Sequence, residues 1–169
     1  MNKNSAIFYS GPSMIDQRAG RRPAGDIIGI ITGLECDSKN KKTGAMLQTF
    51  ILIDDVKNGG GVEWLPSDNV MNGRDQSVCG NCPRRPYLID IGRSKKDPCY
   101  VEILKSVNSV YRSYANGKIV RRPDLLELIE QSGRSLRCGS YGDPAAIPAT
   151  IWEAMILHAT GHTGYSHEW

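Results

Sequence analysis

Two apolar runs rich in β-branched residues dominate the first third of the chain. They cover residues 26–32 (DIIGIIT) and 46–53 (MLQTFILI). Each run has the length and composition of one strand. The stretch between them, residues 36–44, is polar and carries three lysines. This pattern predicts two antiparallel strands joined by a long basic hairpin loop.

Two other stretches are expected to be irregular. Gly11-Pro12, Gly20 and Pro23 interrupt the first 25 residues, where we expect no regular element. The segment from Ser67 to Lys96 is rich in Gly, Pro, Asn and Arg. A long irregular segment in a small domain needs another source of order, and a bound metal would supply one.

After Cys99 the apolar residues recur every three or four positions, as on one face of a helix. The pattern predicts helices over residues 101–114, over residues 124–132 and from Pro148 onward, with a strand over residues 135–141. We therefore expect one α/β domain over residues 1–169. It would combine an N-terminal antiparallel β-hairpin with a partial barrel-like or open sheet carrying helices, stabilised by a Cys-ligated metal site.

Composition narrows the class of protein. Of the 169 residues, 40% are hydrophobic and 23% charged, a balance typical of a globular chain. No apolar run reaches the roughly 18 residues that a membrane span needs, so we expect no membrane association. The first residues lack the apolar stretch of an export signal. Five cysteines, an odd number, favour reduced thiols, and these features together predict a cytoplasmic location.

The cysteines carry the most specific signal. Cys79 and Cys82 are separated by two residues, Pro83 follows, and Cys99 lies sixteen residues after Pro83. Two cysteines on one tight turn can bind one metal ion, with the third returning from a loop, so we expect zinc or an iron–sulfur cluster. The alternative is that all three are ordinary small residues. Zinc would need a fourth ligand, and the candidates are Cys36, Cys138, His158, His162 and His167.

Grouped basic residues suggest contact with phosphates. The net charge is only +3, but basic residues cluster along the chain. The residues expected to bind nucleic acid or phosphate are Lys39, Lys41, Lys42, Arg84 and Arg85. The alternative is a solvated surface, since Lys42-Thr43-Gly44 lacks the full phosphate-loop frame.

Three further residues are candidates for catalysis. Asp143 follows the predicted strand 135–141 and is either the cap of the following helix or a site residue. Tyr165 and His167 lie in a C-terminal segment that could form an acid–base or ligand cluster. Tyr165 could equally close the core or stack on a base. His158 falls on the apolar face of the last helix, where a core position is expected.

Several motifs together resemble an uncharacterised family of proteins encoded by phages, prophages and related mobile elements. The shared motifs are Gly11-Pro12-Ser13-Met14, Ile31-Thr32-Gly33-Leu34, Asn40-x-Lys42-Thr43-Gly44-Ala45-Met46-x-Gln48, Cys79-x-x-Cys82-Pro83, Cys99-Tyr100-Val101, residues 139–148 (GSYGDPAAIP) and residues 163–169 (TGYSHEW). That family supplies no activity to transfer. The resemblance argues against Cys36 and Cys138 as ligands, because related sequences vary there. A fainter likeness is to radical S-adenosylmethionine enzymes, although their three cysteines are more closely spaced.

Two classes of function remain open. In the first, the chain is a cytoplasmic metal-binding protein of a phage or mobile element, which engages a host protein or nucleic acid without catalysis. In the second, it is a nucleic-acid-modifying metalloenzyme, distantly similar to radical S-adenosylmethionine enzymes. The sequence leaves open whether the chain is an enzyme.

Overall fold

A computed structural model of the chain describes residues 3–21, 25–36, 44–59, 64–93, 99 and 101–168. The strands are β1 (Ser5–Pro12), β2 (Asp26–Thr32), β3 (Leu47–Ile53), β4 (Leu136–Tyr141) and β5 (His162–Gly164). The α-helices are α1 (Met14–Ala19), α2 (Pro66–Met71), α3 (Gln76–Cys79), α4 (Pro86–Asp90), α5 (Asn108–Ala115), α6 (Leu125–Ser132) and α7 (Ala149–Leu157). A π-helical turn, η1 (Ile103–Val107), leads into α5, and a 3₁₀ turn, η2 (Pro144–Ala146), follows β4.

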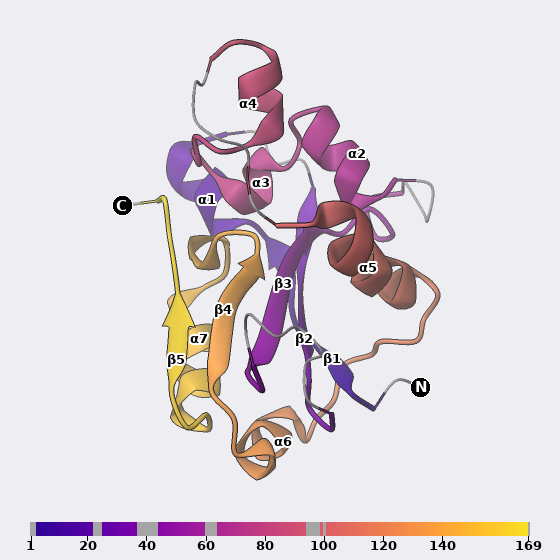
Figure 1. Cartoon of the computed structure of the whole chain (residues 1–169), viewed down its shortest axis with the longest axis vertical. Coiled ribbons are helices and arrows are strands. Elements are labelled where there is room, and N and C mark those ends of the chain that lie inside the picture. Colours follow the sequence, from indigo (N-terminus) through magenta and orange to yellow (C-terminus); the bar gives the residue numbers. More distant parts are fainter. Residues whose placement is uncertain are drawn as a thin grey trace.

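The five strands form one open, mixed sheet in the order β1-β2-β3-β4-β5. The first three strands are antiparallel neighbours, whereas β3, β4 and β5 run parallel. In Figure 1, α5 lies in front of the sheet, α7 lies behind it, and α1 to α4 gather beyond the end toward which β4 and β5 point. An open α/β sheet is thus confirmed, and the barrel-like alternative is not what the chain forms. In the described ranges, no helix is long and apolar enough to cross a membrane.

The elements with strong periodic patterns match their predictions. β2 and β3 pair antiparallel from Ile27 opposite Ile53 to Thr32 opposite Gln48. All seven residues of β3 are buried, as expected for a strand with neighbours on both sides and packing on both faces. The predicted strand before Asp143 and the three predicted helices are also present, with α5 preceded by the π-helical turn.

The prediction that the first 25 residues hold no regular element is wrong. They contain β1 and α1, and two of the supposed breakers, Pro12 and Gly20, stand at the ends of these elements, whereas Pro23 lies outside the described residues. Pro12 is the last residue of β1, where a missing N–H is tolerated at a sheet edge. Gly20 caps α1 in the left-handed conformation.

The predicted irregular segment is more ordered than expected. Within 67–93 the chain forms most of α2 and all of α3 and α4, each only four to six residues long. Such short helices give too few repeats for a period to be visible in the sequence. The core position predicted for His158 is also wrong. α7 ends at Leu157, and the His158 ring turns outward, with Nδ1 2.9 Å from Glu130 Oε2.

One irregularity in β4 shapes the end of the sheet. Between the pairs Gln48–Arg137 and Phe50–Tyr141, β4 contains two more residues than β3. Gly139 lies in this bulge with φ +72°, a conformation that favours glycine. The buried Thr49 hydroxyl forms hydrogen bonds with two backbone groups of the bulge. Its Oγ1 donates to Arg137 O and accepts from Gly139 N, both at 2.8 Å. The bulge thereby sets where Tyr141 and the following loop lie.

We expect Thr49→Val to lower the free energy of unfolding by about 1–3 kcal/mol. The substitution keeps the shape of the side chain but removes its two hydrogen bonds to part-buried backbone groups of the bulge, and each such bond contributes roughly 0.5–1.5 kcal/mol. Urea denaturation measures the change. Thr150→Val, at an exposed position of α7, is the matched control and should stay within about 0.5 kcal/mol of the parent. Equal stability of the two variants would contradict the role of Thr49.

Candidate functional site

A buried ion pair organises the turn that carries the first two cysteines. The Arg85 guanidinium contacts Asp75 Oδ1 through Nε at 3.0 Å and Nη2 at 2.5 Å. The same side chain donates to two backbone carbonyls of the segment, Gly73 O at 2.6 Å and Gly80 O at 3.4 Å. Both charged side chains are at most 4% exposed. Burial raises the pKa of the Asp75 carboxyl, and the hydrogen bonds and charge of Arg85 oppose that rise.

This geometry changes the role expected for Arg85. The sequence predicts that Arg84 and Arg85 both contact phosphates, but Arg85 is buried beneath the turn and its donors are engaged there. Arg84, its neighbour in sequence, is exposed. A phosphate at this surface would therefore meet Arg84 rather than Arg85.

The three cysteines predicted as ligands come together around one cavity. Cys82 N donates to Cys79 O at 3.3 Å, and Cys99 N donates to Arg84 O at 2.9 Å, so a backbone hydrogen bond ties the third cysteine to the turn of the first two. All three side chains line a cavity of about 760 Å³. The cavity lies at the carboxyl end of β4, where open α/β sheets commonly bind ligands.

Tyr141 is a site residue that the sequence analysis missed. It is the last residue of β4, it is only 4% exposed, and it lines the same cavity as Cys79. Burial raises the pKa of the Tyr141 hydroxyl well above its ordinary value, and Cys79, Asp75 and Cys99 nearby add to the rise. Burial likewise raises the pKa of the Cys79 thiol well above its ordinary value, with further contributions from Asp75 and Cys99.

The cysteines do not stand in coordination geometry. Among the residues that the structure describes, no group of three or more His, Cys, Asp or Glu side chains is arranged to hold a metal ion. All five cysteines are free thiols. The arrangement brings candidate ligands to one cavity wall without assembling them around a common point.

Asp143 connects three segments that are far apart in sequence. Its carboxylate accepts from Ala145 N at 2.9 Å, which caps the turn η2, and from His167 N at 2.6 Å. Its own N–H donates to Val78 O in α3 at 2.6 Å. Of the two roles considered for Asp143, the cap is therefore present. Both carboxylate oxygens accept hydrogen bonds from backbone N–H groups.

The C-terminal segment lies against the cysteine turn. The Glu168 carboxylate accepts from Asn81 N at 2.5 Å, and His167 Nε2 is 3.8 Å from Cys82 Sγ. Tyr165 is 79% exposed and lines the rim of the cavity. Figure 1 shows this tail running from β5 toward α1 and α3. The structure thus brings the predicted site residues Asp143, Tyr165 and His167 to the cysteines.

The other proposed fourth ligands lie in different surroundings. Cys36 is exposed beyond the end of β2 at the opposite end of the sheet, where its N–H bonds to Asn4 Oδ1. His158 faces Glu130 on α6, and His162 is exposed in β5 opposite Leu136. Cys138 lines the cavity from β4 and is buried. Lys39, Lys41 and Lys42 lie outside the described residues.

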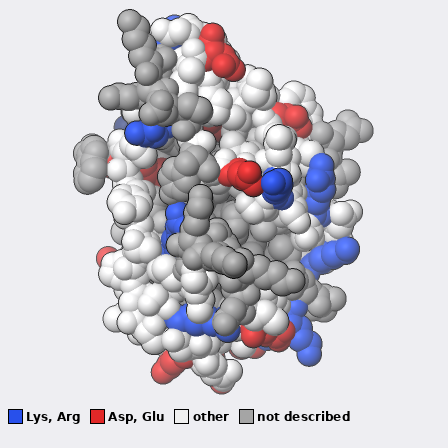
Figure 2. Space-filling model, in the orientation of Figure 1, with Lys and Arg blue, Asp and Glu red and all other residues white. Residues whose placement is uncertain are grey.

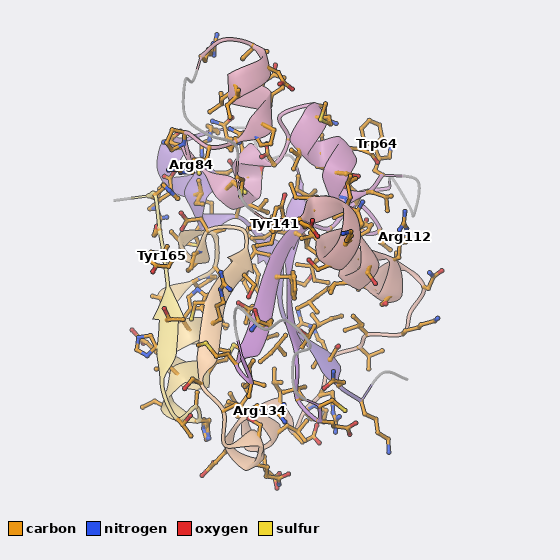
Figure 3. The ribbon with its side chains drawn as sticks, viewed as in Figure 1. Trp64, Arg84, Arg112, Arg134, Tyr141 and Tyr165 are labelled. Carbon is orange, nitrogen blue, oxygen red and sulfur yellow. The ribbon has the colours of Figure 1, made fainter. Side chains whose placement is uncertain are left out.

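Basic and aromatic side chains frame the mouth of the cavity. Arg84 and Arg137 both line it, together with Tyr165. Figure 3 shows Arg84 and Tyr165 on one flank of the molecule, Tyr141 near its centre, and Arg112 on α5 at the opposite flank. On the face seen in Figure 2, the described Lys and Arg side chains form separate groups mixed with acidic ones. On this face, the described positive charge is therefore confined to such groups.

Comparisons of the chain with protein-family models, with curated proteins and with solved structures found no match. The resemblance to a phage-encoded family stays a prediction from the sequence motifs.

We expect Arg85→Met to lower the free energy of unfolding by about 3–5 kcal/mol, because it leaves the Asp75 carboxylate buried without its partner. Chemical denaturation measures the loss. Asp75→Asn combined with Arg85→Met should be less destabilised than Arg85→Met alone, since the unpaired charge is gone. Arg84→Met is the neighbouring control and should change stability by only about 0.5 kcal/mol. Similar losses in Arg84→Met and Arg85→Met would refute the assignment.

Proposed function

We propose that this chain is a metal-binding protein that engages nucleic acid through the cavity beside its cysteines. The proposed ligands are Cys79, Cys82 and Cys99, and the metal is zinc or an iron–sulfur cluster. The observation that carries the proposal is the convergence of these three cysteines with Arg84, Arg137 and Tyr165 on one cavity. A phage or mobile-element origin and action in the host cytoplasm remain predictions from the sequence.

The metal part rests on ligand type and backbone geometry. Thiolates from a tight Cys-x-x-Cys turn and a third nearby segment of backbone are a common set for zinc and for iron–sulfur clusters. Cys99 is already tied to the turn through Arg84 O. Metal binding deprotonates thiols and is coupled to local folding, so the proposal includes a closing of the three side chains around the ion.

The nucleic-acid part rests on the chemistry of the cavity mouth. Arginine guanidinium groups pair with phosphate oxygens in a planar, two-pronged geometry. An exposed tyrosine beside them offers a surface on which a base can stack. Arg84, Arg137 and Tyr165 supply both features within one cavity. On the face seen in Figure 2, the described basic side chains form separate groups, which favours contact with a few nucleotides over contact along an extended strand.

A metalloenzyme acting on nucleic acid is the second candidate, and one observation favours it. The cavity lies where α/β sheets commonly hold reacting groups, and the buried Tyr141 lines it together with Cys79. Protein purified without oxygen that is brown and contains iron and sulfide would favour this candidate. A colourless protein with one equivalent of zinc would favour the binding protein.

We expect chelation of the metal to lower the melting temperature by about 5–11 °C. Free metal at 100 times its Kd stabilises a fold by about 2.7 kcal/mol, and each kcal/mol shifts the melting temperature of a chain of this size by roughly 2–4 °C. Elemental analysis and thermal melts with and without chelator test this expectation.

The matched variants are Cys82→Ser and Cys36→Ser. Cys82→Ser should abolish the chelator effect, whereas Cys36→Ser, at the exposed end of the sheet away from the cavity, should preserve it. Less than about a tenth of an equivalent of zinc or iron in aerobic and anaerobic preparations alike would rule out the metal part.

We expect Arg84→Gln to weaken binding of short nucleic acids and to reduce the slope of log K against log salt by about one unit. One lost phosphate contact releases about one counterion fewer. Fluorescence anisotropy with labelled single-stranded and double-stranded DNA and RNA measures both quantities. Arg112→Gln, an exposed arginine on α5, should behave like the parent. If the parent binds none of these probes, a host protein becomes the better partner hypothesis.

A further inference from the structure

We infer that His167 is the fourth ligand of the metal bound by Cys79, Cys82 and Cys99, giving a tetrahedral Cys₃His zinc site closed by the C-terminal segment. The inference rests on the proposed metal binding and adds to it the ligand that the cysteines alone do not supply. The role of the C-terminal segment would then be to bring an imidazole nitrogen to the cysteine turn.

The distance between two of the ligands already fits. His167 Nε2 lies 3.8 Å from Cys82 Sγ. Zinc–sulfur and zinc–nitrogen bonds of about 2.3 and 2.05 Å at a tetrahedral angle place two such atoms about 3.6 Å apart. These residues are 85 positions apart in sequence and come from different segments of the fold. The inference requires Cys79 and Cys99, which are not arranged around a common point with this pair, to close around the same ion when it binds.

The backbone on both sides of the imidazole is anchored to the site. His167 N donates to Asp143 Oδ2 at 2.6 Å, and the next residue, Glu168, accepts from Asn81 N at 2.5 Å within the cysteine turn. Ser166 Oγ in turn accepts from Glu168 N at 3.1 Å. The ring is therefore delivered by a segment held on two sides, although the His167 side chain itself is exposed. This combination suits a ligand that must be in place before the metal arrives.

The cysteine turn is shaped to receive this tail. Gly80 adopts φ +59° and ψ −136°, which favours glycine, and a Cβ at this position would overlap the Glu168 carboxylate. Glycine is therefore favoured at position 80 for two reasons: the backbone conformation of the turn and the contact with Glu168. Residues 80–82 and 167–168 therefore form a close and specific contact.

The competing ligands are less well placed. His158 is engaged with Glu130, His162 is exposed at the start of β5, and Cys36 lies at the other end of the sheet. Cys138 remains as a rival because it lines the same cavity. It belongs to the strand, with its Cβ against Gly164, whereas His167 is already next to a proposed ligand.

Titration of the metal-free chain, residues 1–169, with Co²⁺ and Zn²⁺ tests the inference. The parent should give the visible absorption bands of tetrahedral cobalt with three thiolates and one nitrogen. His167→Ala should bind zinc at least about 100-fold more weakly, more than the 10–100-fold typical of losing a group that only supports a ligand. His167→Cys should recover most of the affinity, with the cobalt bands shifted to those of four thiolates, a change that a structural histidine would not produce.

Three controls separate the possible outcomes. His162→Ala and Cys138→Ala should match the parent, and melting of each metal-free variant checks that it folds. If His167→Ala keeps the parent's affinity and spectrum while Cys82→Ser loses binding, the inference is overturned and the proposed metal binding stands. Loss of cobalt binding in Cys138→Ala, with His167→Ala unchanged, would assign the fourth position to Cys138. If the parent binds neither ion, the proposed function falls and the inference with it.

Discussion

The hydrogen bonds of Asp143 are the constraint on which the site depends. This one residue joins α3 through Val78 O, the turn after β4 through Ala145 N, and the C-terminal segment through His167 N. α3 and η2 are only four and three residues long. Asp143 is buried, and both its carboxylate oxygens and its backbone N–H form hydrogen bonds. These bonds place the three segments relative to the sheet. Because Asp143 lies just after β4, its hydrogen bonds fix the segments that line the cavity to the end of the sheet.

The cysteine turn has an internal source of order besides any metal. From the sequence alone, a metal cross-link is the expected source of order for residues 67–96. Within residues 73–85, the buried ion pair of Arg85 and Asp75 is a second source of order, because the guanidinium also donates to the carbonyls of Gly73 and Gly80. A scaffold that is shaped in advance lowers the ordering cost of binding. The turn is therefore pre-organised for a ligand in a way that an isolated Cys-x-x-Cys peptide is not.

The sequence predicted the elements that carry a repeating apolar pattern, and it missed the features that depend on tertiary contacts. β2, β3 and α6 carry regular apolar patterns, so periodicity alone located them. β5 has three exposed residues and no pattern to detect. Arg84 and Arg85 look alike in sequence, and only the position of Asp75 makes one of them structural. The cysteines and the tail were identified as chemistry-bearing segments, but their meeting through Asp143 depends on hydrogen bonds that no local pattern encodes.

The parallel pairing of β3 with β4 has a consequence for how the molecule folds. The bond between Thr49 and Arg137 closes a loop of 88 residues, at an entropic cost of about 4 kcal/mol before any contact repays it. β1, β2 and β3 pair with their neighbours in sequence and close much shorter loops. Non-local pairing of this kind slows folding. We therefore expect β1, β2 and β3 to pair before β4 joins the sheet, so that the cavity at the end of β4 forms late in folding.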